Sequence, residues 1–329
     1  MSKPLVLVTA PTVSEQAQQL LRDAGADIAF MANPVNEAAL LSALSRRKTD
    51  AVLLRGPAPF TSAVLAVAND LKIISKHGAG IDSVDMQSAT ARGVAVMVAG
   101  GANADAVAEH ALTLMLCLAR EVPQFDHGLR KGVWKDQGYV FRDFRGRTVG
   151  IVGHGQIGRR TAQLARACGA HVVIYSRSRA EAPLGMEREE NLDRLLGRVD
   201  ILSLHCPLTP ETRGMIGEKQ LQQMKPDAFI INTARGQLID EAALVAALGS
   251  GRLAGAGLDT FATEPPDPRN PLFALPNVIC TPHIAAATAD AALRMGTIAS
   301  NNIISYLRGE IYDASNFLNP AVFNGAKRA

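Results

Sequence analysis

Three polar residues of complementary chemistry follow three separate apolar runs in the second half of the chain. An arginine can clamp a carboxylate and polarise the neighbouring carbonyl through charge-assisted hydrogen bonds. An imidazole can pass a proton to the carbonyl oxygen, and a carboxylate bonded to that imidazole favours its charged form. Such a set fits the reduction of a 2-oxo acid by a hydride donor. The three residues are Arg235, Glu264 and His283, which follow residues 228–232, 254–258 and 278–280.

Each of the three is also compatible with an ordinary structural role. Arg235 could be a salt-bridge partner, Glu264 a surface acid and His283 a packed histidine. The catalytic interpretation needs the three apolar runs to be strands of one parallel sheet, because the carboxyl ends of such strands converge at one edge.

Residues 148–158 have the composition of a dinucleotide-binding turn. A short apolar run at 148–152 suits a buried strand and leads directly into a glycine-rich turn. Gly153 permits the sharp turn, Gly155 lets the backbone approach a pyrophosphate, and Gly158 lets the next helix pack closely on its strand. A second apolar run at 171–175 completes a βαβ unit. The residues predicted to hold the pyrophosphate are Gly153, Gly155, Gln156, Ile157 and Gly158.

No carboxylate stands at the end of that second strand. Units that bind NAD place Asp or Glu there to hold the ribose 2′-hydroxyl. Arginine instead offers a bidentate fork to phosphate oxygens. We therefore predict NADP(H) as the cofactor, with NAD as the alternative, and a solvated loop as the structural alternative. The residues concerned are Ser176, Arg177, Ser178 and Arg179.

The remaining apolar runs predict an α/β protein with two doubly wound parallel-sheet domains. Residues 101–287 contain six candidate strands and form the expected Rossmann dinucleotide-binding domain. Residues 1–100 alternate five short strands with amphipathic helices and form the expected smaller, flavodoxin-like substrate domain. A helix predicted within 289–308 crosses back to this smaller domain. Residues 288–329 therefore belong to it, and the domain is discontinuous.

Two strand ends of the smaller domain carry candidate substrate ligands. Backbone N–H groups in a glycine-containing turn can bind a carboxylate, and nearby cations add attraction. Solvated surface charges are the alternative for both basic residues. The candidates are Arg55, Lys76, Gly78, Ala79 and Gly80.

Residues 103–120 predict a helix that is apolar on nearly every side, which indicates burial and a face that meets a second subunit. Within it, Glu109 and His110 are interpreted as a polar pair capping a buried helix surface. Residues 121–147 contain many charges and one proline near their start, and are predicted to be an irregular arm.

Composition excludes several classes of function. A net charge of +3 and 5% aromatic residues, without a basic stripe, argue against nucleic-acid binding. The longest apolar run, residues 111–119, is too short to span a bilayer, so no membrane role is expected. Four cysteines without CxxC spacing indicate free thiols of a cytoplasmic protein and no metal site.

Five motifs in order resemble the D-isomer-specific 2-hydroxyacid dehydrogenases, and the resemblance covers essentially the whole chain. The motifs lie at residues 149–158, 205–209, 232–236, 257–259 and 282–284. The resemblance implies a catalytic Arg235, Glu264 and His283, and a substrate carboxylate bound at 78–80. It also implies a homodimer formed through the 103–120 helix and its following arm. The further cofactor contacts that it implies are Cys206, Pro207, Thr212, Thr233 and Asp259, the last holding the nicotinamide carboxamide.

Several activities are compatible with this resemblance. We favour a glyoxylate or hydroxypyruvate reductase. A D-3-phosphoglycerate dehydrogenase-like enzyme is the alternative, since Lys76 and Arg55 could meet a phosphate. A formate dehydrogenase fits less well, because those relatives have glutamine where Glu264 stands. A dinucleotide-sensing protein similar to the C-terminal-binding corepressors is the alternative from another class. After His283 the chain has alanines where family members often have glycine, which predicts a narrower wall beside the nicotinamide.

Overall fold

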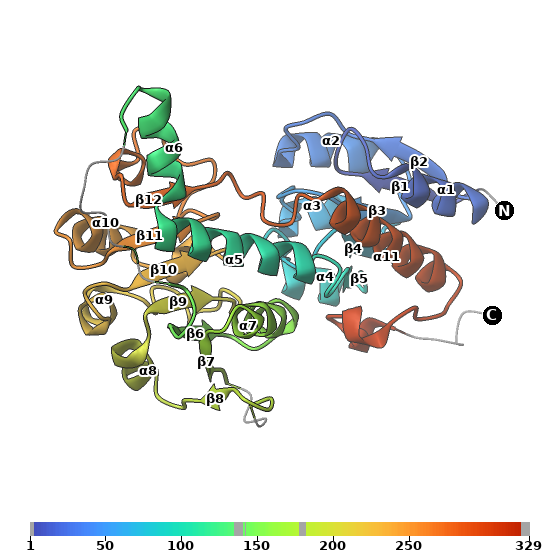
Figure 1. Ribbon diagram of the computed structural model, residues 1–329. Coiled ribbons are helices and arrows are strands. Elements are labelled where there is room, and N and C mark those ends of the chain that lie inside the picture. The colour runs from blue at the N-terminus through green and yellow to red at the C-terminus, as the bar shows by residue number, and fades with distance from the viewer. Residues whose placement is uncertain (1–2, 135–140, 142, 178–181, 324–329) are drawn as a thin grey trace. The chain divides into compact units, whose positions relative to one another are not determined.

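The computed structural model describes residues 3–134, 141, 143–177 and 182–323 (Figure 1). The chain forms two compact units. The first consists of Met1–Asn103 and Thr288–Ala329, and the second of Ala104–Ala287. Ser178 and Arg179, both expected to contact the cofactor, lie outside the described residues.

The first unit is built on a five-stranded parallel sheet with the order β2-β1-β3-β4-β5. This is the flavodoxin-like order of a doubly wound sheet, as predicted. Strands such as Leu-Val-Leu-Val are apolar throughout because helices cover both faces. The strands are β1 (Leu5–Val8), β2 (Asp27–Phe30), β3 (Ala51–Leu54), β4 (Ile73–Lys76) and β5 (Ala95–Val98).

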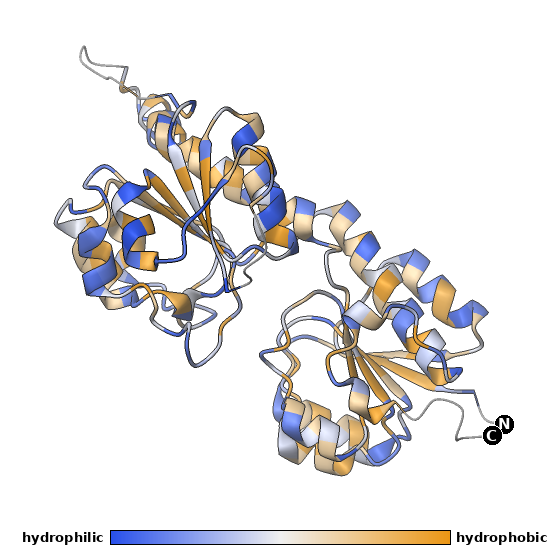
Figure 2. Ribbon diagram, turned by 90° about the horizontal axis from the view of Figure 1, so that it is seen from below, coloured by the Kyte–Doolittle hydropathy of each residue, from blue (hydrophilic) through white to orange (hydrophobic). Residues whose placement is uncertain are grey.

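Two layers of helices cover this sheet, and one of them comes from the end of the chain. On one face α1 (Glu15–Asp23) packs beside α11 (Ala289–Leu307). On the other lie α2 (Glu37–Arg46), α3 (Ser62–Val67) and α4 (Met86–Ala91). Figure 2 shows hydrophobic strands in the middle and hydrophilic residues on the outer sides of the helices.

The segment after α11 is also fastened to the first unit. Asn319 Oδ1 accepts a hydrogen bond from the Val96 N–H at 2.8 Å, and Asn316 Oδ1 accepts one from the Gly100 N–H at 2.9 Å. The first unit therefore contains both ends of the described chain.

The second unit has a seven-stranded parallel sheet with the order β12-β11-β10-β9-β6-β7-β8. Six of these strands match the prediction. Counted with β8 as the third strand, the strands from β6 to β11 have the Rossmann order 3-2-1-4-5-6, and β12 extends the sheet beside β11. The two residues of β8 were not predicted, because Glu-Arg has no apolar pattern. The strands are β6 (Thr148–Val152), β7 (His171–Tyr175), β8 (Glu187–Arg188), β9 (Ile201–Leu204), β10 (Phe229–Asn232), β11 (Gly255–Leu258) and β12 (Val278–Cys280).

Helices cover both faces of this second sheet as well. One face carries α5 (Ala104–Arg120) and α7 (Gln156–Ala167), and the other carries α8 (Leu192–Arg198), α9 (Glu218–Gln223) and α10 (Glu241–Gly249). Among the described residues, no helix combines the length and apolar character needed to cross a membrane.

The arm predicted to be irregular contains a helix, so that prediction was wrong for α6 (Val122–Arg130). Pro123 lies in its first turn, where proline needs no hydrogen-bond partner. Val122, Phe125 and Leu129 recur at helical spacing and give α6 an apolar side. None of its residues is buried in the chain.

Candidate active site

A histidine and a glutamate meet at the carboxyl end of the second sheet. His283 lies just after β12 and Glu264 lies in the loop after β11, which is the neighbouring strand. His283 Nδ1 and Glu264 Oε2 are 2.6 Å apart. Both side chains are partly open to solvent, with exposed fractions of 50% and 36%. An imidazole supported by a carboxylate and still accessible can exchange a proton with a ligand.

The contact shifts the pKa values of both groups in opposite directions. The hydrogen bond that His283 donates to Glu264 raises the pKa of His283. The charges of Glu264 and Asp259 raise it further, whereas burial and the charge of Arg235 lower it. Burial would raise the pKa of Glu264, but the hydrogen bonds of His283 and of the Phe261 N–H outweigh it and lower that pKa. The pair therefore favours a protonated imidazole beside an ionised carboxylate.

Arg235 is held in a tight turn after β10. The buried Asn232 side chain accepts the Ala234 N–H at 3.0 Å and donates to the Arg235 carbonyl at 2.8 Å. Gly236 lies so close to Phe261 that a Cβ there would meet its carbonyl carbon at 2.0 Å. This close approach presses the Arg235 turn against the Glu264 loop, and the charge of Arg235 acts on both Glu264 and His283.

The sheet order explains why the three residues come together. β10, β11 and β12 are adjacent in the sheet, so their carboxyl ends form one edge. His283 and Glu264 are in direct contact there, and Arg235 is within electrostatic reach of both.

The glycine turn between β6 and α7 has the features of an anion site. Gly153 has φ +95°, and a Cβ on Gly158 would meet the Gly153 carbonyl oxygen at 2.0 Å. By contrast, nothing lies within 4 Å of a Cβ built on Gly155. Among the residues that the structure describes, no side chain caps α7, so the N–H groups of Gln156 and Ile157 at its start lack the usual capping partner. The turn fits a pyrophosphate.

Basic groups surround the end of β7, where NAD-binding units carry an acid. Arg177 is exposed and its charge lowers the pKa of Glu211, although the hydrogen bond from Thr209 is the larger cause. Arg188 Nη2 donates to the Ser176 carbonyl at 3.3 Å. His154 has a buried Nε2 without a hydrogen-bond partner among the described residues. Burial, then Arg159 and Arg188, lower the pKa of this imidazole.

Arg188 and His154 were not predicted as site residues. His154 stands inside the glycine motif, and a polar side chain at that position was the available signal. Arg188 is distant in sequence and reaches Ser176 only because β8 pairs with β7. No local pattern could indicate that pairing.

Other predicted cofactor residues lie in loops after β9 and β10. The Thr233 hydroxyl is buried and has no hydrogen-bond partner among the described residues, so it is available to a ligand. Thr212 Oγ1 donates to the Pro207 carbonyl at 2.7 Å and so shapes the loop from within. Burial raises the pKa of Cys206 to about 11, so its thiol stays protonated. Asp259 is completely buried after β11.

The predicted substrate ligands of the first unit follow β3 and β4. Arg55 Nη1 donates to the Thr12 carbonyl at 2.8 Å, and Lys76 Nζ donates to the Gly56 carbonyl at 2.5 Å. In the described part of the chain, the N–H groups of Ala79 and Gly80 have no hydrogen-bond partner. Gly78 itself is buried and donates to the Lys76 carbonyl. Two adjacent free N–H groups are suited to a carboxylate.

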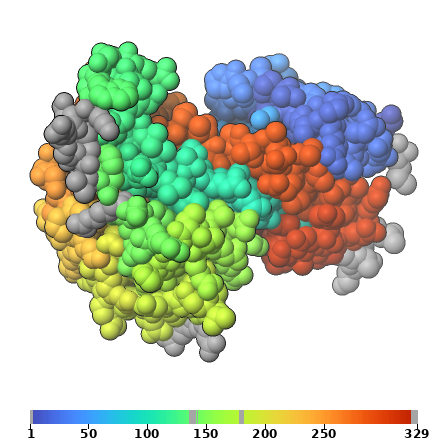
Figure 3. Space-filling view, in the orientation of Figure 1, coloured from blue at the N-terminus to red at the C-terminus, as the bar shows by residue number. Residues whose placement is uncertain are grey.

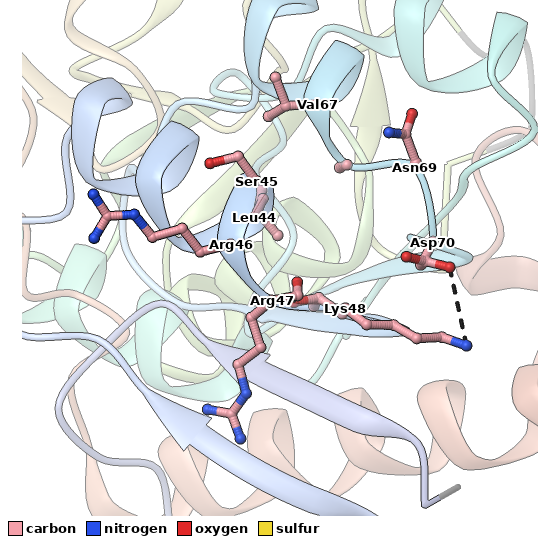
Figure 4. A pocket seen from close by; sticks show the side chains of 10 residues that line it. Leu44, Ser45, Arg46, Arg47, Lys48, Val67, Asn69 and Asp70 are labelled. Atoms are coloured by element: carbon pink, nitrogen blue, oxygen red, sulfur yellow. Dashed lines mark hydrogen bonds and ion pairs between the residues drawn. The ribbon is translucent and has the colours of Figure 1, made fainter. Parts of the chain in front are cut away.

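A hollow in the first unit does not have the character of an active site. It measures about 140 Å³ and lies between the carboxyl ends of α2 and α3 (Figure 4). Arg46 and Arg47 point away from each other, and Lys48 faces Asp70 at 4.0 Å. The hollow precedes β3 and β4 in the chain, whereas ligands of parallel sheets bind beyond the carboxyl ends of strands.

Comparison with known protein families finds a match that lies within the second unit. A family model described as "D-isomer specific 2-hydroxyacid dehydrogenase, NAD binding domain" matches residues 112–285. That range contains the glycine turn together with Arg235, Glu264 and His283.

Individual relatives extend the similarity to nearly the whole chain. A D-3-phosphoglycerate dehydrogenase from Archaeoglobus fulgidus is 37% identical over 308 residues, 92% of this chain and 57% of that protein. A glyoxylate reductase from Aeropyrum pernix is 36% identical over 321 residues, 94% of this chain and 95% of that protein. This chain spans about half the length of the phosphoglycerate dehydrogenases that it matches.

A solved structure shares the complete fold. It is an NADPH-dependent glyoxylate/hydroxypyruvate reductase from Sinorhizobium meliloti in complex with NADP and malonate. The TM-score is 0.85 at 29% sequence identity, and the match covers 98% of each chain.

Proposed function

The chain belongs to the D-isomer specific 2-hydroxyacid dehydrogenase family, and we propose on that premise that it interconverts a small 2-oxo acid and its D-2-hydroxy acid. Family membership confirms the resemblance of its sequence motifs. The observation that carries the proposed activity is the 2.6 Å contact between His283 Nδ1 and Glu264 Oε2. It gives this family member a supported, solvent-accessible proton donor.

The roles of the three residues follow from their chemistry. When bound, the nicotinamide dinucleotide supplies the hydride. Because Glu264 holds Nδ1 of His283, Nε2 is the nitrogen left to give a proton to the substrate carbonyl oxygen. In the oxidative direction the same nitrogen takes the proton back. Arg235 holds the substrate carboxylate and polarises the carbonyl. General acid catalysis of this kind contributes about 10²–10⁴-fold to rate.

The cofactor of this reaction is NADP(H), with NAD(H) the weaker ligand. Ser176 replaces the acid that would hold a ribose diol, and Arg177 and Arg188 bring positive charge to the same loop. A 2′-phosphate would complement these charges and would give the buried His154 Nε2 an anionic neighbour. The similar reductase from Sinorhizobium meliloti is NADPH-dependent.

Glyoxylate or hydroxypyruvate is the favoured substrate. The glyoxylate reductase of Aeropyrum pernix matches this chain over nearly the full length of both proteins. For the loop at 78–80 in the first unit we propose a carboxylate as the ligand, bound by the free N–H groups of Ala79 and Gly80. A phosphorylated 2-oxo acid is the alternative, because Arg55 and Lys76 could meet a phosphate and several relatives are D-3-phosphoglycerate dehydrogenases.

A substrate panel tests this proposal. Glyoxylate, hydroxypyruvate and phosphorylated 2-oxo acids are each assayed with NADPH and with NADH at equal concentration, following loss of the reduced nicotinamide. We expect turnover of the small acids with NADPH. His283→Ala is the matched control and should lower kcat by about 10²–10⁴-fold while leaving the NADPH Kd nearly unchanged.

The other results are equally informative. Turnover of phosphorylated acids alone would favour the phosphoglycerate-type activity, and a clear preference for NADH would contradict the cofactor proposal. Tight dinucleotide binding with negligible turnover of every acid would favour a corepressor-like sensor of dinucleotides.

The protein acts as a homodimer in this proposal. Val122 and Leu129 on α6 are more than half exposed, and Figure 3 shows α6, in green, at the surface. Both residues line a hollow of about 520 Å³, together with Arg120, Phe125 and Asp126. Exposed apolar patches of this kind mark interaction surfaces. The cytoplasmic location expected from the sequence remains a prediction.

A further inference from the structure

A buried carboxylate lies directly behind the turn that carries His283. Asp259 is completely buried, and both of its oxygens accept hydrogen bonds from this turn. Oδ1 accepts from Thr281 Oγ1 at 2.6 Å and from the Ile284 N–H at 2.9 Å. Oδ2 accepts from the Ala285 N–H at 2.8 Å. One carboxylate therefore fastens the chain on both sides of His283.

His283 needs such support because of its backbone conformation. Its φ is +53°, in the left-handed region that residues other than glycine rarely adopt. A residue in this region persists only when its surroundings determine it. The hydrogen bonds that Asp259 accepts from residues 281, 284 and 285 hold His283 in this conformation.

A second histidine extends the arrangement to α5. His110 Nε2 lies 3.0 Å from Thr281 Oγ1 and 3.7 Å from Asp259 Oδ1. The Thr281 hydroxyl has one hydrogen, which it donates to Asp259 Oδ1. His110 must then donate its Nε2–H to Thr281. The interpretation of Glu109 and His110 as a polar pair capping a buried helix surface missed this role. Only Glu109 is exposed, whereas His110 is partly buried beside Thr281.

The packing of α5 on β11 explains how His110 reaches this position. A Cβ on Gly255 would lie 3.2 Å from Leu118 Cδ2, and one on Gly257 would lie 2.9 Å from Leu114 Cβ. Residues four apart on a helix share a face, as do residues two apart on a strand. Four residues further back along α5 and two residues further along the chain after β11, the same register places His110 beside Asp259. The two glycines thus let α5 approach closely enough for the hydrogen bond.

We propose that His110, Thr281 and Asp259 are positioning residues, which hold the left-handed turn of His283 so that its imidazole faces Glu264. This rests on the proposed function, in which His283 is the proton donor. Asp259 acts here through the turn, whether or not it also meets the nicotinamide. Loss of the chain of hydrogen bonds frees the turn and weakens the contact between His283 and Glu264.

The test uses isosteric pairs of variants. Thr281→Val removes the hydroxyl at constant shape, and Thr281→Ser restores it. His110→Phe removes the donor, and His110→Gln keeps an N–H. Glu109→Gln is the matched control on the exposed side of the same helix. Each full-length variant is assayed for kcat, KM and NADPH Kd, and the pKa of His283 is read by NMR titration of its ring.

Within the described residues, the charges that act on His283 are those of Glu264, Arg235 and Asp259, and all three remain in these variants. We expect Thr281→Val to lower kcat by up to about 100-fold, with little change in NADPH Kd. The pKa of His283 should fall, because Glu264 supports its proton less. His110→Phe should act in the same direction, while Thr281→Ser, His110→Gln and Glu109→Gln stay close to the wild type.

An unshifted His283 pKa in both Thr281→Val and His110→Phe would overturn the proposal, even if both variants were less stable. If Thr281→Val fails to fold, His110→Phe decides alone. The NMR readout does not require turnover. A wild-type protein that reduces none of the acids therefore contradicts the proposed function, and the positioning role is still decided by the titration.

Discussion

Glu264 sets the pH range of the proposed reduction through its contact with His283. The reductive direction needs a protonated imidazole, and the pKa of His283 is raised by the Glu264 hydrogen bond. Activity should therefore persist above the ordinary histidine pKa and fall as the pH rises through the raised value. In Glu264→Gln the charge is lost and the pKa of His283 drops. The falling limb of kcat/KM should move to lower pH, as measured in a pH series.

Asp267→Asn provides the control for this experiment, since Asp267 is an exposed acid of the same loop that pairs with Arg269. Its profile should match the wild type. A Glu264→Gln profile with the same falling limb as the wild type would show that another group governs it.

A substitution of Arg177, another single residue, tests the cofactor proposal. A hydrogen bond to a charged group contributes about 1.5–3 kcal/mol, which is about 10- to 100-fold in Kd. Arg177→Ala should weaken NADPH binding by roughly this factor and change NADH binding little. Fluorescence titration with both cofactors measures the ratio. Arg308→Ala, which removes the same charge from the exposed end of α11, should leave the ratio unchanged. Equal losses for both cofactors would contradict a 2′-phosphate contact.

At the scale of elements, two glycines of one turn should respond differently to alanine. A Cβ at Gly158 would collide with the Gly153 carbonyl oxygen, whereas space is open at Gly155. Gly158→Ala should therefore lower the Tm of the free protein. Gly155→Ala should keep the Tm but weaken NADPH binding, because the methyl group occupies the approach of the pyrophosphate. Calorimetry and cofactor titration separate the two effects. Unchanged NADPH affinity in Gly155→Ala would contradict binding of the pyrophosphate at this turn.

The predictable parts of this molecule are those encoded by local patterns. Six strands of the second sheet and the glycine turn were predicted, because continuous apolar runs and glycine spacing are visible within a few residues. The helix α6 was missed because the many charges of the segment 121–147 hid its short apolar stripe. The two residues of β8 carry no pattern of their own.

Contacts across long stretches of sequence were beyond local patterns. The direct contact of Glu264 with His283 could be anticipated only by assuming neighbouring strands. The bond from His110 to Thr281 joins residues 171 positions apart and depends on how α5 seats on β11. Arg188 likewise reaches Ser176 through strand pairing. Such contacts are set by the tertiary register, which no single segment specifies.

For the whole molecule, the exposed apolar side of α6 predicts self-association. Sedimentation of the wild-type protein should give the mass of a dimer. Leu129→Asp places a charge on the exposed apolar side, where burial against a partner would be costly. We expect this variant to shift toward monomer with an unchanged far-UV spectrum. Lys131→Asp, which changes a polar neighbour, is the comparison. A monomeric wild-type protein would exclude the proposed homodimer.

The return of α11 to the first unit has a consequence for synthesis on the ribosome. Val6 and Val8 are buried in one cluster with Ala299 and Ile303. A nascent chain that has emerged as far as β5 holds every strand of its sheet and α1, but the part of that face that α11 covers is still exposed to water. This part of the sheet stays accessible to chaperones until the second unit and then α11 have been translated. The unit whose translation starts first is therefore the one completed last.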